Sequence, residues 1–513
     1  MTAGATSLAE RLLAEQSAGD RPALGDGTVA LSRGALHQRL ERLATLLAGL
    51  ATRDGRPIAL AADNGVDWIL ADLACQLADI PQLPLPGFFS PAQRRHALHQ
   101  SRVALVLTDR VEDWRPEGGQ VIASLPDSGL QLLRLADVTG EDGADPLPPG
   151  TGKITYTSGS TGAPKGVCLG NRQLLCQADA LARRVALDRP RHLCLLPLPV
   201  LLENIAGVHT CLLAGGEVLA PALASLGLSG SSGLDPVRLT RAIDHHRPHS
   251  LILIPQMLTA LVAAAEAGWR PPGSLAFVAV GGSRVAAGQI LRARALGLPV
   301  YEGYGLSECA SVVSLNVPGD DRPGSAGRPL PHLDVRVEQG EIVIAGNPFL
   351  GYVGEPASWG QGRIPSGDLG RLDSDGFLHL AGRRKNLLIS SFGRNISPEW
   401  VESELLASPL IRDCVVVGDA RPWLGALICP SAGVGDDAIA DSIARCNREL
   451  PDYARVRAWH RLAAPLAAVP GLVTATGKPR RDAIHAHFKG AVEALYTPLD
   501  RRPNPLVLPE VTP

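Results

Sequence analysis

The chain has 513 residues, of which 45% are hydrophobic and 19% are charged, and its formal net charge is −2 at pH 7. This length is too great for one hydrophobic core, so we expect a large domain with several lobes and at least one smaller domain. The near-neutral charge excludes the strongly basic surface with which proteins bind nucleic acid or anionic membranes. No uncharged apolar run is long enough to span a bilayer.

The cysteines bear on the compartment in which the protein works. There are 9 of them, an odd number, and no pair has the spacing of a metal site or a redox motif. Both features favour reduced thiols in a cytosol over a disulfide framework. Residues 1–16 show no basic segment followed by an apolar run, so no secretory signal is predicted. We therefore expect a soluble, cytoplasmic protein; its oligomeric state is not predicted.

The first part of the chain alternates between helix-like and strand-like patterns. Helical apolar spacing covers residues 7–16, 34–50 and 66–78. Strand-like apolar runs occupy residues 57–62, 103–108, 153–156, 192–196, 250–254 and 275–280. Strands that alternate with helices indicate parallel sheets with helices on both faces, which is an α/β fold.

The composition changes near residue 322. Residues 321–375 contain short strands, as at 334–337 and 341–345, and Gly/Pro turns, which predict a β-rich lobe. The basic run Gly382-Arg383-Arg384-Lys385-Asn386 follows, and a compact α+β segment lies beyond it. That segment contains predicted helices at 398–406 and 437–449 and predicted strands at 414–417 and 425–428. The predicted organisation is an N-terminal domain at 1–382, a hinge at 383–386, a C-terminal domain at 387–496 and a Pro-rich disordered tail at 497–513.

The strongest motif is Tyr156-Thr157-Ser158-Gly159-Ser160-Thr161-Gly162-Ala163-Pro164-Lys165-Gly166. It follows a predicted strand and combines hydroxyl side chains and glycines with one lysine. Backbone N–H groups and hydroxyls in such a loop can converge on an anion. The motif differs from a Walker loop, because the spacing before Lys165 is different and Gly166 stands where Ser or Thr is needed. A flexible Gly/Ser loop is the alternative interpretation.

This loop resembles the phosphate loop of the adenylate-forming superfamily, which contains acyl-CoA synthetases, carrier-protein-loading adenylation domains and beetle luciferases. Similarity runs from about Arg21 to His487, and four further motifs occur in the superfamily's order. They are Tyr301-Glu302-Gly303-Tyr304-Gly305-Leu306-Ser307-Glu308, Ser366-Gly367-Asp368-Leu369-Gly370 with Asp375-Gly376, Gly382-Arg383-Arg384-Lys385 continuing to Ser397-Pro398, and Thr476-Gly477-Lys478 with Arg481. The chain is most similar to the long-chain fatty acyl-CoA synthetases. The resemblance implies a large AMP-binding domain and a small mobile C-terminal domain.

The resemblance also implies roles for individual residues. Catalysis is assigned to Lys478, Glu308, Thr161 and Lys165, and Glu308 is the expected ligand of Mg²⁺. The expected nucleotide and cofactor contacts are Thr157, Ser158, Gly159, Ser160, Thr161, Gly162, Lys165, Gly281, Gly282, Gly303, Tyr304, Gly305, Ser307, Asp368, Arg383, Gly393 and Lys478. The implied cofactors are ATP, Mg²⁺ and coenzyme A, or the phosphopantetheine of a carrier protein.

Elementary chemistry agrees with these assignments. A carboxylate is a poor acyl donor, and its attack on the α-phosphate of ATP gives a mixed anhydride and expels pyrophosphate. The charge on the polyphosphate calls for preorganised donors and a metal ion. A carboxylate such as Glu308 is a hard oxygen ligand that suits Mg²⁺. Asp368, in a glycine-flanked turn, can accept both ribose hydroxyls or cap an Asx turn. Tyr304 offers a face for adenine or belongs to the core.

The segment Leu196-Pro197-Leu198-Pro199-Val200-Leu201-Leu202-Glu203-Asn204 resembles the substrate-gate motif of long-chain acyl-CoA synthetases. Val200 stands where those enzymes usually carry an aromatic residue or histidine. No aspartate occupies the place where amino-acid-activating relatives bind the substrate amine. The resemblance therefore favours an apolar acid, namely a medium- or long-chain fatty acid. Glu203 and Asn204 are interpreted either as polar pocket residues or as helix N-terminal groups near the dipole.

The identity of the acceptor thiol is left open by one loop, Ser390-Ser391-Phe392-Gly393-Arg394-Asn395. Phe392 stands where relatives often have a glycine, beside the path of the pantetheine arm. Coenzyme A is the favoured acceptor, and a separate acyl carrier protein is the alternative. Another adenylate-forming chemistry, such as β-lactone synthesis, and a ligand-binding homologue without catalysis are further alternatives. The intact catalytic set argues against the last of these.

Overall fold

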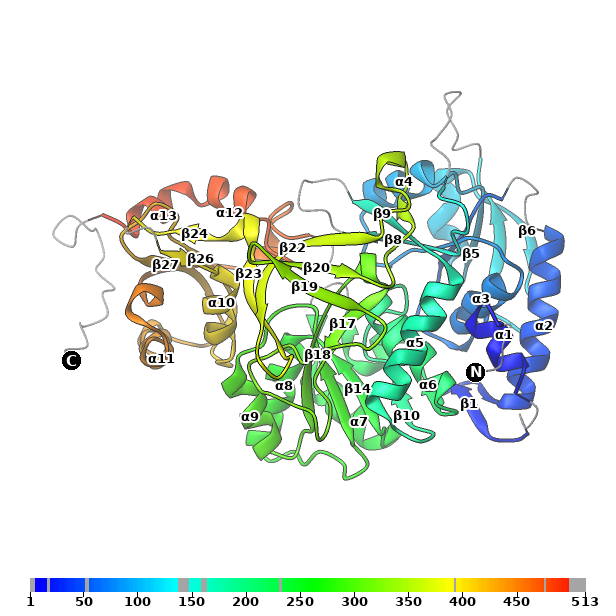
Figure 1. Ribbon diagram of the computed structural model, residues 1–513, viewed down its shortest axis with the longest axis horizontal. Coiled ribbons are helices and arrows are strands. Elements are labelled where there is room, and N and C mark those ends of the chain that lie inside the picture. Colours follow the sequence, from blue (N-terminus) through cyan, green and yellow to red (C-terminus); the bar gives the residue numbers. More distant parts are fainter. Residues whose placement is uncertain are drawn as a thin grey trace.

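The computed structural model describes residues 5–15, 19–50, 55–136, 147–157, 164–229, 233–391, 394–474 and 477–497. Figure 1 shows a large N-terminal domain, coloured blue to yellow, beside a smaller C-terminal domain, coloured yellow to red. Apart from residue 497, the predicted tail lies outside the described residues. Within the described stretches, every helix is too short or too polar to cross a membrane.

A nine-stranded sheet forms one half of the large domain, with the strand order β18-β17-β16-β15-β14-β10-β11-β1-β2. Its strands are Pro22–Gly25 (β1), Ala30–Ser32 (β2), Arg191–Leu193 (β10), Glu217–Leu219 (β11), Ser250–Leu253 (β14), Phe277–Val280 (β15), Val300–Leu306 (β16), Ser311–Leu315 (β17) and Arg328–Pro329 (β18). The strands from β16 to β1 are parallel, as the alternating pattern predicts. At the edges β2, β17 and β18 pair antiparallel, which short connections allow.

An eight-stranded sheet forms the other half, with the order β21-β9-β8-β4-β3-β5-β7-β6. Its strands are Ile58–Ala61 (β3), Gln82–Pro84 (β4), Leu105–Thr108 (β5), Gln120–Ser124 (β6), Gln131–Arg134 (β7), Lys153–Thr157 (β8), Lys165–Leu169 (β9) and Gly351–Tyr352 (β21). The four central strands are parallel and the outer pairs are antiparallel. The predicted parallel arrangement therefore holds for the centre of each sheet and not for the edges.

Helices cover these two sheets (Figure 1). The α-helices of the large domain are Leu8–Leu13 (α1), Arg33–Leu50 (α2), Val66–Leu77 (α3), Pro91–Gln100 (α4), Asn171–Val185 (α5), Thr210–Leu213 (α6), Pro236–His246 (α7), Pro255–Glu266 (α8) and Ala287–Ala295 (α9). Leu202–His209 (η2) is a π-helix that leads into α6. Short 3₁₀ turns include Val111–Glu117 (η1), Leu223–Leu226 (η3), Ser307–Cys309 (η4), Pro356–Ser358 (η5) and Arg384–Asn386 (η6). A π-helix is rare and often lies near a functional site.

The predicted β-rich lobe is an antiparallel sheet of four strands, β19-β20-β22-β23. The strands are Asp334–Glu338 (β19), Glu341–Ala345 (β20), Arg363–Leu372 (β22) and Leu378–Arg383 (β23). A separate hairpin joins Leu228–Ser229 (β12) to Gly233–Leu234 (β13). Strand β23 runs directly into the 3₁₀ turn η6, so the lobe leads straight to the predicted hinge.

The small domain packs helices on a three-stranded sheet, β26-β27-β28. Its elements are Leu388–Ile389 (β24), Asn395–Ile396 (β25), Pro398–Leu406 (α10), Ile411–Val417 (β26), Leu424–Pro430 (β27), Asp436–Glu449 (α11), Asp452–Ala454 (η7), Val456–Arg461 (β28), Leu466–Ala468 (η8), Arg481–His487 (α12) and Lys489–Ala494 (α13). Helix α10 begins where predicted, because the Ser397 hydroxyl accepts the N–H of Trp400 and proline fills the first helical position.

Helix α10 is also tied to the start of α12 and to the hinge. Arg481 donates to both oxygens of Glu402 at 2.9 and 2.7 Å. Glu399, one turn earlier, accepts from the Asn386 amide at 2.6 Å and lies 3.4 Å from Arg481. Burial alone would lower the pKa of Arg481, but Glu402 and Glu399 raise it above its usual value. The Arg481 ion pairs and the Asn386 hydrogen bond thus connect the start of α12, helix α10 and the hinge.

A buried polar network links the two halves of the large domain. Asp72 of α3 accepts from Lys153 of β8 at 2.6 Å and from His209 of η2 at 2.9 Å. Lys153 also donates to Asn204 of η2. All four side chains are buried. Burial alone would raise the pKa of Asp72, but Lys153 and His209 hold it well below its usual range. Asp72 therefore stays charged in the interior.

Candidate active site

The predicted phosphate loop connects two paired strands. β8 and β9 are antiparallel, and Thr157 lies opposite Lys165. A side chain at Gly166 would clash, because a Cβ there would lie 2.7 Å from Val353 and 2.9 Å from Tyr156. The loop residues between these strands, which include Ser158, Gly159, Ser160, Thr161 and Gly162, lie outside the described residues. The hairpin brings the two ends of the loop together, with Lys165 at its exit.

Lys165 contacts a group of side chains that the sequence motifs do not contain. Its ammonium lies 2.8 Å from a carboxylate oxygen of Glu355 and 4.8 Å from the ring centre of Tyr352. The Tyr352 hydroxyl donates to Glu308 at 2.8 Å. Burial and then Glu308 raise the pKa of Tyr352. The predicted phosphate lysine and the predicted magnesium ligand are thus joined through one tyrosine.

Tyr352 and Glu355 were missed at the sequence level. The available signal was the glycine-rich run Gly351-Tyr352-Val353-Gly354-Glu355, which lies within the β-rich segment. In the fold, β21 pairs with β9, and Tyr352 lies opposite Val167. This pairing places Tyr352 beside the phosphate-loop hairpin, although the two segments are far apart in the chain.

A second group of side chains surrounds Asp368. The Tyr304 hydroxyl donates to one carboxylate oxygen at 2.8 Å, and Arg383 Nε donates to the other at 2.9 Å. Strands β22 and β23 hold Asp368 opposite Arg383. Burial and then Asp368 raise the pKa of Tyr304. Each carboxylate oxygen keeps a further lone pair, so Asp368 can still accept two hydroxyl groups. Its carboxylate faces these side chains rather than capping its own turn.

The predicted glycines in β16 have a structural reason to be glycine. A Cβ at Gly305 would lie 1.7 Å from the carbonyl oxygen of Ser311, and one at Gly303 would lie 2.9 Å from Leu315. Both glycines therefore let β16 approach β17 closely. Ser307 then opens the turn η4, which carries Glu308. Close strand packing and the position of Glu308 thus depend on the same segment.

Gly281 and Gly282 follow β15 at the carboxyl edge of the parallel strands. Gly282 has a φ of +85°, which favours glycine. Gly281 is buried, and a Cβ there would lie 3.4 Å from the Gly303 carbonyl. In open α/β sheets, ligands bind at this edge. Both glycines therefore lie where a ligand can approach the backbone.

Lys478 comes from the small domain and lies among charged groups of the large domain. Burial and then Arg383 lower its pKa, whereas Asp368 and Glu308 favour its charged form. Lys478 is nevertheless exposed to solvent. The preceding Gly477 has a φ of +78°. Gly393, the remaining predicted contact, lies outside the described residues.

These groups fit a nucleotide with its magnesium ion. One oxygen of Glu308 accepts from Tyr352, and the other has no partner within the described part of the chain. Mg²⁺ is commonly held by one or two carboxylates together with phosphates and water, so a single acid suffices. Lys165 offers positive charge to phosphate, and Asp368 offers acceptors to ribose. These described side chains are of the types that Mg²⁺-ATP needs.

Small apolar residues lie near this edge of the sheet. Leu202 and Ala206, on one face of η2, pack against the same two hydrophobic clusters as Ala279 of β15. All three remain partly exposed. Val200, the residue that departs from the gate motif, is also partly exposed. All four of these side chains are apolar and uncharged.

Glu203 and Asn204 point the other way, into the protein. Both are buried. Glu203 accepts the backbone N–H groups of Leu195 and Leu196 and pairs with His192 at 2.7 Å. Asn204 belongs to the Asp72 network. The interpretation as helix N-terminal groups agrees with the structure, because Glu203 and Asn204 lie in the first turn of η2. The interpretation as pocket residues does not, because both side chains are buried in the interior.

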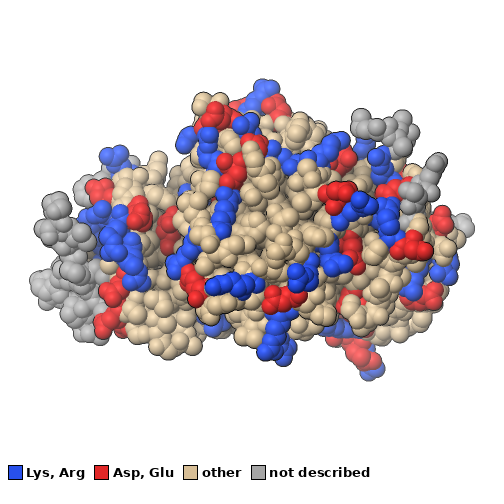
Figure 2. Space-filling model, turned by 90° about the horizontal axis from the view of Figure 1, so that it is seen from below, with Lys and Arg blue, Asp and Glu red and all other residues tan. Residues whose placement is uncertain are grey.

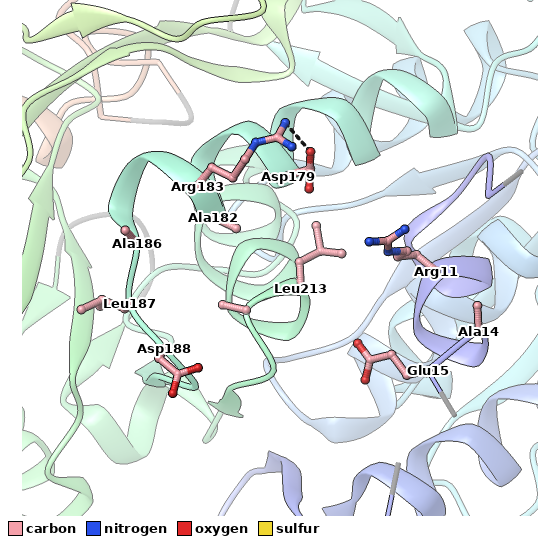
Figure 3. Close-up of a pocket in the computed structure, with 11 residues that line it drawn as sticks. Arg11, Ala14, Glu15, Asp179, Ala182, Arg183, Ala186, Leu187, Asp188 and Leu213 are labelled. Atoms are coloured by element: carbon pink, nitrogen blue, oxygen red, sulfur yellow. Dashed lines mark ion pairs between the residues drawn. The ribbon is translucent and has the colours of Figure 1, made fainter. Parts of the chain in front are cut away.

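A cavity of about 540 Å³ lies elsewhere, between α1, α5 and α6 (Figure 3). Arg183 pairs there with Asp179 on the same helix, and Arg11 and Glu15 of the N-terminal segment face the opening. None of its lining residues belongs to the motifs.

Figure 2 shows acidic and basic side chains interspersed over one face of the molecule.

The fold and the site together define an adenylate-forming enzyme of the AMP-forming acid–thiol ligase class. The chain belongs to the AMP-binding enzyme family: the model of that family matches residues 13–355. The model of the AMP-binding enzyme C-terminal domain matches residues 385–500. The gap between the two matches contains β22, β23 and the start of the predicted hinge.

Relatives and solved structures agree with this assignment. The chain is 30% identical over 454 residues to a feruloyl-CoA synthase of Amycolatopsis sp, with 82% of this chain and 88% of the relative covered. It is 33% identical over 233 residues to a long-chain-fatty-acid–CoA ligase of Mycobacterium bovis, which covers 40% of this chain and 39% of the relative. The O-succinylbenzoate coenzyme A synthetase of Bacillus subtilis in complex with ATP and magnesium ion matches with a TM-score of 0.73, 24% identity and 93% and 98% coverage. The expected cofactors ATP, Mg²⁺ and coenzyme A are consistent with this class.

Proposed function

We propose that this protein uses Mg²⁺-ATP to activate an apolar carboxylic acid, a medium- or long-chain fatty acid, and transfers the acyl group to coenzyme A. The observation that carries the proposal is the meeting of Lys165, Glu308, Asp368 and Lys478 at one site. These residues come from the eight-stranded sheet, the nine-stranded sheet, the β-rich lobe and the small domain.

In the first step, a carboxylate oxygen of the acid attacks the α-phosphorus of ATP. A new P–O bond forms, the bond to the β-phosphate oxygen breaks, and pyrophosphate leaves with the electron pair. Lys165 and the phosphate loop hold the departing charge, and Lys478 stabilises the charge between the acid and the α-phosphate. Asp368 and Tyr304 orient the nucleoside, and Glu308 would hold a magnesium ion that would neutralise phosphate charge.

In the second step, the sulfur of coenzyme A attacks the activated carbonyl carbon. The C–S bond forms, the C–O bond to the phosphate breaks, and AMP leaves. Lys478 occupies the nucleotide site in the first step, so the small domain turns about the predicted hinge at 383–386 before the thiol enters.

The acid is assigned from the surface formed by Leu202, Ala206 and Ala279. Small side chains leave space for an acyl group, and the absence of charge among these three residues favours an apolar one. An aryl acid is the second candidate, because the relative named feruloyl-CoA synthase covers 82% of this chain. A panel of fatty, aryl and amino acids, assayed for ATP–pyrophosphate exchange, separates these candidates. Exchange with amino acids alone would contradict the apolar assignment.

The same assay should include two acceptors, coenzyme A and a holo acyl carrier protein. Thioester formation with coenzyme A is expected. Thioester formation with the carrier alone would identify the carrier as the acceptor. The variant Phe392→Gly then tests whether that side chain selects the acceptor.

Ala279→Phe should shorten the range of acids that are accepted. The added ring fills space beside Leu202 and Ala206, so long or bulky acids should lose about tenfold or more in kcat/KM while short acids keep theirs. Rates of pyrophosphate exchange across a series of chain lengths measure this. An equal loss for every acid would mean that the acyl group binds elsewhere.

Tyr352→Phe should raise the KM for Mg²⁺-ATP. The substitution keeps the ring under Lys165 and removes only the hydrogen bond to Glu308. A hydrogen bond to a charged group contributes about 1.5 to 3 kcal/mol, so an increase of about tenfold is expected. Pyrophosphate exchange at varied Mg²⁺-ATP concentration measures it. An unchanged KM would show that Tyr352 does not position Glu308.

A further inference from the structure

Arg284 of the large domain lies within electrostatic range of two acids on α10 of the small domain. Arg284 lies in the connection between β15 and α9, and its Nη1 donates to the carbonyl of Leu380 at 3.0 Å. Leu380 belongs to β23, the last strand before the hinge. Glu399 and Glu404, both on α10, attract the guanidinium. Arg284 therefore contacts the strand before the hinge and faces the helix after it.

On the side of the large domain, Arg284 faces Glu302. This carboxyl is 6% exposed, and one of its oxygens lies 3.4 Å from the N–H of Val285. Burial raises the pKa of Glu302 to about 7, and Arg284 opposes the shift. Burial also lowers the pKa of Arg284. A cation in such surroundings needs acids near it, and two of its three acids, Glu399 and Glu404, lie on the other domain.

A hydroxyl group forms a second bridge between the domains. Gln289 of α9 donates to Thr259 Oγ1 of α8 at 2.6 Å. That hydroxyl lies 3.1 Å from the carbonyl of Pro255 and 3.4 Å from the carbonyl of Leu406, so it can donate to either. Leu406 ends α10, where helix carbonyls lack partners within the helix. The large domain thus caps a helix of the small domain.

We propose that Arg284 and Thr259 are positioning residues that hold the small domain in the orientation in which Lys478 reaches the nucleotide site. The inference rests on the proposed role of Lys478 in the first step. Glu404 and Leu406 lie beyond the hinge, so a turn of the small domain separates them from Arg284 and Thr259. The two contacts therefore favour formation of the acyl adenylate and oppose the turn that precedes thiol attack.

The test uses substitutions at the contact and matched controls. Glu404→Gln removes the charge that faces Arg284, and Glu449→Gln makes the same change at the neighbouring acid on α11, which repels Glu404. Thr259→Val removes the bridging hydroxyl, and Thr259→Ser keeps it. Both half-reactions are followed separately in the full-length protein by rapid quench, with a fatty acid that wild type accepts and with its synthetic acyl adenylate.

Glu404→Gln and Thr259→Val should lower the rate of acyl-adenylate formation about fivefold to tenfold, which is an ordinary size for such a coupling. Thioester formation from supplied adenylate should stay within about twofold of wild type or rise, since a coupling that favours one state opposes the other. Both controls should behave like wild type. Backbone hydrogen exchange should increase at 398–406 in the two contact variants and not in the controls.

Other outcomes overturn the inference. An equal loss in both half-reactions would indicate a structural effect alone, and an unchanged adenylation rate would show that the contacts do not hold Lys478 in place. Failure of the proposed function would be seen differently, because wild type itself would then form no adenylate with any acid.

Discussion

Lys478→Ala should abolish adenylate formation and leave thioester formation from supplied acyl adenylate nearly intact. The reason is that Lys478 lies with Asp368, Arg383 and Glu308, where charge develops in the first step. Loss of one preorganised charge at such a site costs about a hundredfold to a thousandfold in rate. Quenched-flow measurement of each half-reaction checks the prediction.

Lys489→Ala is the matched control, because it removes the same charge from an exposed position on α13. It should leave both rates unchanged. Lys385→Pro should do the reverse of Lys478→Ala, since a stiffened hinge slows the turn that precedes thiol attack. Equal losses in both half-reactions for both variants would contradict the idea that one domain serves two steps in two orientations.

Lys153→Met should destabilise the protein by about 3 to 5 kcal/mol, the usual effect of removing one partner of a buried ion pair. Methionine keeps most of the apolar stem of lysine, so little of the destabilisation should come from a cavity. Asp72 would remain buried with His209 as its one basic partner among the described residues. Chemical denaturation, followed by fluorescence and by circular dichroism, gives the change in the free energy of unfolding.

The pH dependence of this variant gives a second check. Lys153 is one of the groups that lower the pKa of His209, after burial. Without Lys153, a protonated His209 can neutralise Asp72, so the destabilisation should be smaller at mildly acidic pH and larger at alkaline pH. Arg183→Ala, which breaks the exposed pair with Asp179, should change stability by less than about 1 kcal/mol. A similar effect of the two substitutions would show that Asp72 is not charged in the native state.

Local sequence patterns predicted helices and strands well where the ends of an element are marked by capping or turn residues. Helix α10 begins and ends as predicted, because Ser397 and Pro398 define its first turn. The β-rich lobe followed from short strands and turns. The antiparallel edges of the two large sheets were not predicted, because the alternation of apolar residues indicates which side chains are buried but not which strands are neighbours.

The site divides in the same way. The resemblance to the adenylate-forming superfamily named Lys165, Glu308, Asp368 and Lys478, because each lies in a motif that is contiguous in the sequence. The motifs could not name Tyr352, whose role depends on the pairing of β21 with β9. Contacts between segments far apart in the chain carry no local pattern. For the same reason, the gate motif could not predict the buried contacts that the side chains of Glu203 and Asn204 make.

The ion pairs around α10 have a consequence for the way Lys478 leaves the site. Arg481 follows Lys478 closely in the chain and is fixed to Glu402, while Glu399 is fixed to Asn386 of the hinge. We therefore expect Lys478, α12, α10 and the hinge to move together when the small domain turns. In the proposed mechanism, the same turn would withdraw the Lys478 ammonium from the nucleotide and open the path for the thiol.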